Sequence, residues 1–158
     1  MYKKINVDDE ELLFTHQHQE VFQKPNAQLL DTMLKAEQYI ATTYQHHRHA
    51  GVHALLLSTQ QHLLQVSTLL SGHFNFKDLT SSLLVRHLIQ ANATRLILVY
   101  CNPTGKTVVR DHQLLGANLL KHELLEYSLW LDDFFIISRP EPGDHHMQTT
   151  SLARLGVV

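Results

Sequence analysis

The stretch Leu96-Ile-Leu-Val-Tyr-Cys-Asn-Pro-Thr-Gly105 decides the fold of this chain. It begins as a continuous apolar run, which is typical of a central strand buried on both faces of a sheet. A Pro-Thr-Gly turn follows, and a helical pattern comes after the turn. The stretch is therefore a strand-to-helix connection of an α/β domain. Such connections commonly carry catalytic or ligand-binding groups.

Helical and strand patterns alternate on both sides of this connection. Apolar residues at helical spacing predict a helix over 27–44, with Asn26 as its candidate N-cap. Two apolar runs joined by a short polar turn predict a β-hairpin of strands 52–58 and 63–70. The remaining predicted elements are one or two peripheral strands within 5–21, a helix from Asp78 or Thr80 to about Asn92, a central strand over 95–101, a helix over 109–127, a strand over 131–138 and an edge strand over 145–152.

Length and composition fit one compact α/β domain. The chain has 158 residues, of which 44% are hydrophobic, and a single core typically serves about 100–200 residues. Neither an internal repeat nor a linker interrupts the pattern. We assign residues 27–158 to the domain and residues 1–26 to an N-terminal extension that we expect to pack on it. The sequence leaves open whether this extension packs on a neighbouring molecule instead.

Charge and cysteine content narrow the choice of partners and compartment. The formal net charge is -2, so nucleic acid is an unlikely partner by charge, since such binding favours a basic surface. Cys101 is the only cysteine, which excludes an intrachain disulfide and indicates a reducing compartment. No apolar run approaches the roughly 18 residues of a membrane span. We therefore predict a soluble, cytoplasmic protein with no membrane contact.

The chain holds 13 histidines, eight of which gather at 16–18, 46–53 and 145–146. None lies in a His-Glu-x-x-His or Cys-x-x-Cys pattern, the spacings that bring ligands together on one ion. We predict that these histidines lie in surface loops, where they could take up nickel or zinc adventitiously. Cys101 alternates with Tyr100 and Asn102 along the predicted strand, so it should be a buried thiol on the opposite face.

Several of these features, in their order along the chain, resemble the RadC-type domains of the bacterial JAB/MPN (JAMM metalloprotease-like) family. Asn102-Pro-Thr-Gly105 resembles that family's His-Pro-Ser-Gly, and Leu131-Asp-Asp133 resembles its Leu-Asp-His before the closing strand. Ser71-Gly72 matches its glycine-containing turn. The resemblance spans about Val52 to Ser138. It implies a single JAB/MPN-like (cytidine-deaminase-like) α/β domain, in which helices flank a mixed β-sheet.

In an active member, two histidines and an aspartate would hold zinc, a glutamate would act as the base on the zinc-bound water, and a serine would stabilise the oxyanion. The resemblance places other residue types at all five positions, namely Tyr100 and Asn102 for the histidines, Gln113 for the aspartate, Arg110 for the serine and Ala50 for the glutamate. A phenol is mostly protonated at neutral pH, and an amide oxygen suits harder ions than zinc. The arginine would repel a cation. We therefore expect no catalytic residue and no cofactor, and a vestigial pocket formed by Tyr100, Asn102, Thr104, Arg110 and Gln113.

Three functions remain open. The first is a catalytically inactive JAB/MPN domain that acts in binding or assembly, with a protein partner or a second copy of itself. The second is a zinc-dependent metallopeptidase or isopeptidase with a relocated metal site that uses some of His49, Asp111 and His112. The third, a DNA-repair-associated accessory protein, rests only on the label of the RadC family. Substrate, partner and oligomeric state do not follow from the sequence.

Overall fold

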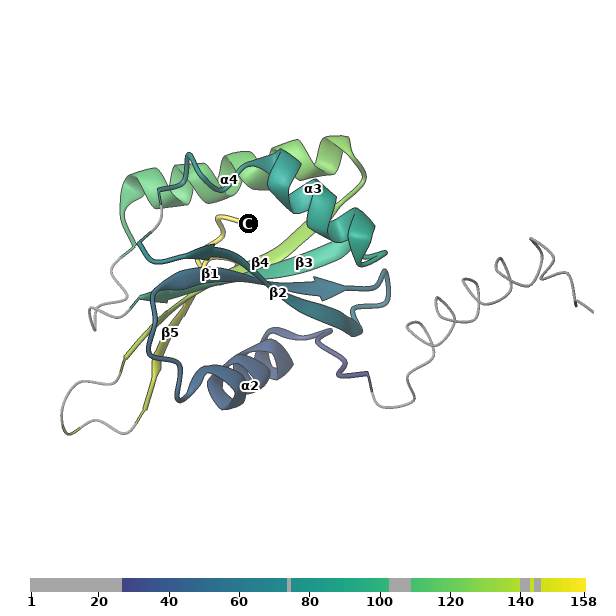
Figure 1. Ribbon diagram of the computed structural model, residues 1–158. Helices are drawn as coiled ribbons and strands as arrows, with labels where there is room; N and C mark the ends of the chain where they lie inside the picture. The colour runs from purple at the N-terminus through teal and green to yellow at the C-terminus, as the bar shows by residue number, and fades with distance from the viewer. Residues whose placement is uncertain (1–26, 74, 103–108, 140–142, 144–145) are drawn as a thin grey trace, which may run out of the picture.

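The computed structural model describes residues 27–73, 75–102, 109–139, 143 and 146–158. These residues form a sheet with helices on both faces (Figure 1). In chain order the elements are α2 (Met33–Tyr44), β1 (Gly51–Leu57), β2 (Leu63–Ser71), α3 (Ser81–Gln90), β3 (Arg95–Asn102), α4 (Asp111–Glu126), β4 (Trp130–Ser138) and β5 (Gln148–Ser151). The strands predicted within 5–21 lie outside the described residues. None of the described helices has the length and apolar character that a membrane span requires.

The strands form a mixed five-stranded sheet in the order β2-β1-β3-β4-β5. β1 pairs antiparallel with both β2 and β3, β3 pairs parallel with β4, and β4 pairs antiparallel with β5. The predicted β1–β2 hairpin and the central position of the strand at 95–101 are thus confirmed. The predicted class, an α/β domain whose mixed sheet is flanked by helices, is confirmed as well.

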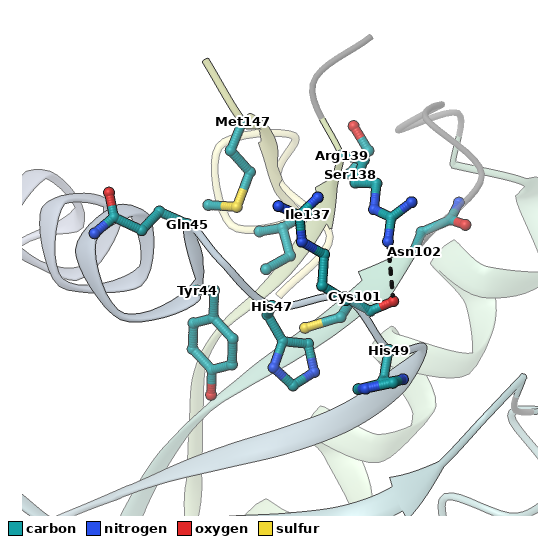
Figure 2. A pocket seen from close by; sticks show the side chains of 11 residues that line it. Tyr44, Gln45, His47, His49, Cys101, Asn102, Ile137, Ser138, Arg139 and Met147 are labelled. Carbon is teal, nitrogen blue, oxygen red and sulfur yellow. Dashed lines mark hydrogen bonds between the residues drawn. The ribbon is translucent and has the colours of Figure 1, made fainter. Parts of the chain in front are cut away.

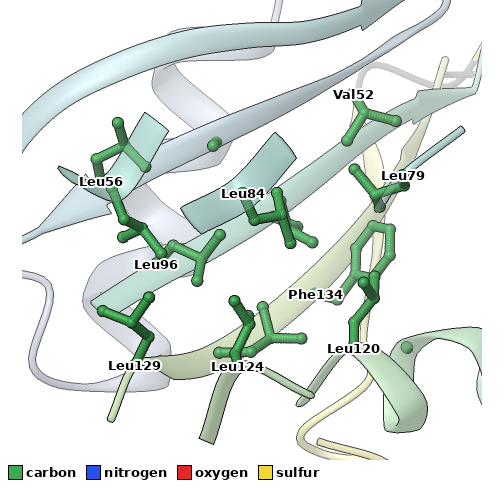
Figure 3. Close-up of a cluster of buried hydrophobic side chains, with 14 of the residues drawn as sticks. Val52, Leu56, Leu79, Leu84, Leu96, Leu120, Leu124, Leu129 and Phe134 are labelled. Atoms are coloured by element: carbon green, nitrogen blue, oxygen red, sulfur yellow. The ribbon is translucent and has the colours of Figure 1, made fainter. Parts of the chain in front are cut away.

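Alternate residues of β3 enter two separate apolar cores. Leu96, Leu98 and Tyr100 belong to the core under α3 and α4 (Figure 3), whereas Ile97, Val99 and Cys101 belong to the core that α2 covers. In Figure 1, α2 lies on one side of the sheet and α3 with α4 on the other. The prediction that Cys101 is buried and faces away from Tyr100 is therefore confirmed.

The predicted start of the first helix was wrong. The helix begins at Met33, and its N-cap is Thr32, whose hydroxyl accepts a hydrogen bond from the Lys35 amide at 3.3 Å. The residues before it run alongside the hairpin turn instead, because Leu29 forms a β-bridge with His62. Hydrophobic spacing did not reveal this competing backbone pairing. In the helix at 81–90 the cap is Thr80, one of the two predicted alternatives.

The side chain of Asp133, in β4, forms hydrogen bonds with β5 and with the residues that follow β5. Its carboxylate accepts hydrogen bonds from the Phe134 and Ala153 amides, at 2.6 and 3.0 Å, and from the Ser151 hydroxyl at 2.6 Å. The side chain is buried, and burial raises its pKa above the usual range. Because each of these donors would lose its partner without Asp133, this carboxyl group holds β5 and the chain after it in place.

We predict that Asp133→Ala lowers the free energy of unfolding by about 3 kcal/mol, because it leaves buried donors without an acceptor. Urea denaturation followed by circular dichroism measures the change. Asp31→Ala is the matched control, since it removes an exposed carboxylate that forms a surface ion pair with Lys35, and it should leave the midpoint unchanged. Equal midpoints for the two variants would contradict the role assigned to Asp133.

Candidate functional site

The positions that the family resemblance singles out do not share one face of the sheet. Tyr100 lies in the core under α4, whereas Asn102 lines a cavity together with Cys101. Tyr100 is buried at 8% exposure, and burial, with a smaller contribution from Cys101, raises the pKa of its phenol. The hydroxyl is therefore protonated at neutral pH. Asn102 is the last residue of β3 and is partly exposed. Thr104 lies outside the described residues.

Arg110 and Gln113 form the start of α4. Arg110 is the N-cap, and its backbone amide donates a hydrogen bond to Oε1 of Gln113 at 2.9 Å. The side-chain oxygen of Gln113, which the resemblance assigns to the position of a ligand aspartate, is thus engaged in capping the helix. Ala50 directly precedes β1, and its carbonyl accepts a hydrogen bond from the Gly72 amide at 2.8 Å. A methyl side chain at this position cannot act as a base.

Taken together, these residues do not fit a zinc ion. A zinc site of this class needs three donors that reach one point. Here the phenol keeps its proton, the Gln113 oxygen is bound to the backbone, and the side chain of Arg110 is cationic. Nothing at these positions supplies a thiolate, an imidazole or a carboxylate.

The three fallback ligands are divided between two places in the fold. Asp111 and His112 are exposed at the first turn of α4. His49 lies in the loop between α2 and β1, where it lines a cavity against Cys101. Among the described residues, no group of three potential metal ligands contains any of these three side chains.

A cavity of about 90 Å³ opens on the face of the sheet that α2 covers (Figure 2). The end of α2, the loop before β1 and the ends of β3 and β4 form its walls. Tyr44, His47, Cys101 and Arg139 are among the side chains at its edge. The Arg139 guanidinium donates a hydrogen bond to the carbonyl of Arg48 at 3.4 Å. This cavity therefore lies on the face opposite to Tyr100.

The prediction that the histidines of 46–53 lie in surface loops was wrong for His53. That residue lies within β1 and is buried at 8% exposure. Burial, and to a smaller extent His47, lowers its pKa, so the ring is neutral at pH 7. The signal was present in the sequence, because the strand pattern from Val52 onward places His53 on the same face as Leu55 and Leu57.

We predict that Cys101 reacts slowly with a disulfide reagent in the folded protein. The thiol is buried, and burial raises its pKa to about 12, so little thiolate is present at pH 8. The rate of thionitrobenzoate release should be at least roughly 100-fold lower than for the chain unfolded in guanidinium. Because Cys101 is the only cysteine, the signal has one source. Equal rates in the folded and unfolded chain would contradict the burial of this thiol.

A comparison with protein families gives a match over most of the described chain. The family model described as the RadC-like JAB domain matches residues 30–154. The matched range begins before α2 and ends after β5, so it includes every described element. A search of curated proteins finds no match to this chain.

Proposed function

Because the chain belongs to the RadC-like JAB domain family, we propose that it is a JAB/MPN-type module that acts by binding rather than by zinc-dependent hydrolysis. The single observation that carries this proposal is the Arg110–Gln113 arrangement at the start of α4. Gln113, at the position of a ligand aspartate, uses its side-chain oxygen to cap the helix at 2.9 Å from the Arg110 amide. A side chain with this structural task is unavailable to a metal ion.

Electrostatics support the same conclusion. Hydrolysis in this family requires a Lewis acid beside a water molecule and a carboxylate that takes the proton from that water. Arg110 would oppose a divalent cation at the vacated position. Ala50 offers no carboxylate, and Tyr100 remains a neutral phenol because burial raises its pKa. Replacement of metal ligands, oxyanion donor and base together favours a role without catalysis.

The outer surface of α4 supports a role in assembly. The helix packs on the sheet through Ala117, Leu120 and Leu124, which are buried. One turn apart on its other side, Leu115 and Leu119 are 62% and 53% exposed. Exposed apolar side chains that lie together are typical of surfaces that bind another protein. We propose a second copy of this chain as the occupant of the Leu115–Leu119 surface.

Hydrolytic activity is the first test. We expect no cleavage of peptide or isopeptide-linked substrates above background when zinc is added to untagged, chelator-washed protein. Asn102→Ala and Asp111→Ala should behave as the unmodified chain does, because neither residue serves a metal. Chelator-sensitive turnover that Asp111→Ala or Asn102→Ala abolishes would overturn the proposal and would support a relocated hydrolytic site.

Self-association is the second test. Sedimentation equilibrium should show a dimer whose dissociation constant increases at least about tenfold in Leu115→Glu, as expected when a charge enters an apolar contact. Leu34→Glu is the matched control, because Leu34 is 63% exposed on α2, on the other face of the sheet. A chain that stays monomeric at all concentrations, or equal effects of the two variants, would exclude a second copy as the partner on α4.

A further inference from the structure

Strand pairing brings a histidine and the only cysteine together on the α2 face of the sheet. β1 and β3 are neighbours, with Gly51 opposite Cys101 and His53 opposite Val99. Cys101 and His53 are thus diagonal neighbours on one face, close enough for long side chains to meet. Gly51 lies beside them, and a Cβ at this glycine would lie 2.7 Å from the Leu70 carbonyl oxygen, too close for a side chain, and 3.7 Å from Nε2 of His53.

A third ligand comes from the loop between α2 and β1. The ligand atoms of His47, His53 and Cys101 all lie within 4.8 Å of one another. The rings of His47 and His53 are 5.0 Å apart and nearly perpendicular. In the described part of the chain, this is the one group of three histidine, cysteine or carboxylate side chains that comes this close. Figure 2 shows His47 beside Cys101.

The same place holds buried polar atoms that lack a partner. Nε2 of His53 and the hydroxyl of Tyr44 are buried, and no other described atom forms a hydrogen bond with either. The two rings lie 5.3 Å apart. Since a buried polar group without a partner costs about 1–3 kcal/mol, such an atom in a folded protein calls for an ion or a water molecule. The unpartnered Nε2 of His53 therefore indicates that a ligand binds at this place.

Thr68 prepares His53 for this role. The Thr68 hydroxyl lies 3.2 Å from Nδ1 of His53, across the β1–β2 pair. If Nδ1 carries the proton and donates it to this hydroxyl, the lone pair on Nε2 is directed toward the cluster. Histidines that bind metals are commonly held in this way, by a hydrogen bond from the ring nitrogen that does not face the ion.

We propose that His47, His53 and Cys101 form a zinc-binding site on the α2 face of the sheet, with three ligands that differ from the residues that the resemblance assigns to the family's zinc. One thiolate and two imidazoles suit zinc, whereas magnesium and calcium prefer oxygen ligands. With one sulfur and two nitrogen ligands, tetrahedral zinc separates its ligand atoms by roughly 3.3–3.5 Å, given Zn–N near 2.0 Å and Zn–S near 2.3 Å. The ligand atoms of the three residues lie within 4.8 Å of one another, somewhat farther apart than this. Because β1 and β3 hold His53 and Cys101 in place, a shift of His47 in the loop before β1 would bring the three atoms to the separation that zinc requires.

Three protein ligands leave a fourth position on the ion, as in zinc sites that bind an exchangeable ligand. Two of the three ligands, His47 and Cys101, also line the 90 Å³ cavity, so a fourth ligand could enter from there. Arg139 lines the same cavity, and its positive charge favours an anionic ligand such as a carboxylate. The chemistry therefore points to zinc with a small anion or a water molecule as its fourth ligand.

Cobalt titration tests the site, because Co²⁺ substitutes for zinc and absorbs strongly when a thiolate binds it. Cys101 is the only cysteine, so a sulfur-to-cobalt charge-transfer band can arise from this residue alone. We expect the band to saturate at one equivalent of Co²⁺ in untagged, chelator-washed protein and to disappear when zinc is added. Cys101→Ser should abolish it.

Histidine variants separate this site from adventitious binding by the other histidines. His47→Ala should weaken cobalt binding at least about 100-fold, more than the loss of a supporting hydrogen bond costs. This loop substitution should preserve the fold, which circular dichroism verifies. His46→Ala, the adjacent exposed histidine, is the matched control and should have no effect. Cobalt uptake without the sulfur band, or a band that His47→Ala leaves unchanged, would overturn the proposal.

Two further variants extend the test. Thr68→Val should weaken cobalt binding about tenfold, because it releases Nδ1 of His53. Gln113→Ala changes a family position on the other face and should leave the band unchanged. A cobalt site that depends on Gln113 and not on Thr68 would place the metal on the α4 face, which would overturn this inference. Failure of the α2-face site alone would leave the proposed binding function intact.

Discussion

The pairing of β3 between β1 and β4 is the constraint on which the rest of the structure depends. β3 forms an antiparallel ladder with β1 and a parallel ladder with β4. Each ladder fixes the register, and a shift of one residue would exchange the side chains of the two faces. Because an apolar core covers each face, such a shift would move each set of side chains into the opposite core and disrupt the packing of both. The end of β3 therefore has a fixed arrangement.

That arrangement places two different chemical environments within one short stretch of sequence. Tyr100 faces the core under α4, whereas Cys101 faces the core under α2. The thiol thus cannot substitute for a lost ligand on the α4 face, although it is adjacent to Tyr100 in sequence. Chemistry based on Cys101 must draw its partners from the elements on the α2 face, which include α2, β1, the loop between them and the end of β4.

The sequence was most informative where one pattern determined the outcome. The apolar run at 96–99 predicted the central strand, and alternation predicted opposite faces for Tyr100 and Cys101. The start of α2 at Met33 was missed, because a β-bridge between Leu29 and His62 competes with helical spacing. The His53–Cys101 proximity was missed for another reason. It depends on which strands are neighbours and in which register, and periodicity within one strand contains neither.

The positions of the family's metal ligands and the His47–His53–Cys101 cluster differ in how their polar atoms are engaged. At the start of α4, the Gln113 oxygen is used within the helix cap, so the local structure is complete without a ligand. Under α2, Nε2 of His53 is buried and remains without a partner. A buried group in this state raises the free energy of the folded chain, and any ion or molecule that binds it lowers that free energy again. The two places thus differ physically: the Gln113 oxygen at the start of α4 has a hydrogen-bond partner within the chain, whereas Nε2 of His53 under α2 has none among the described atoms.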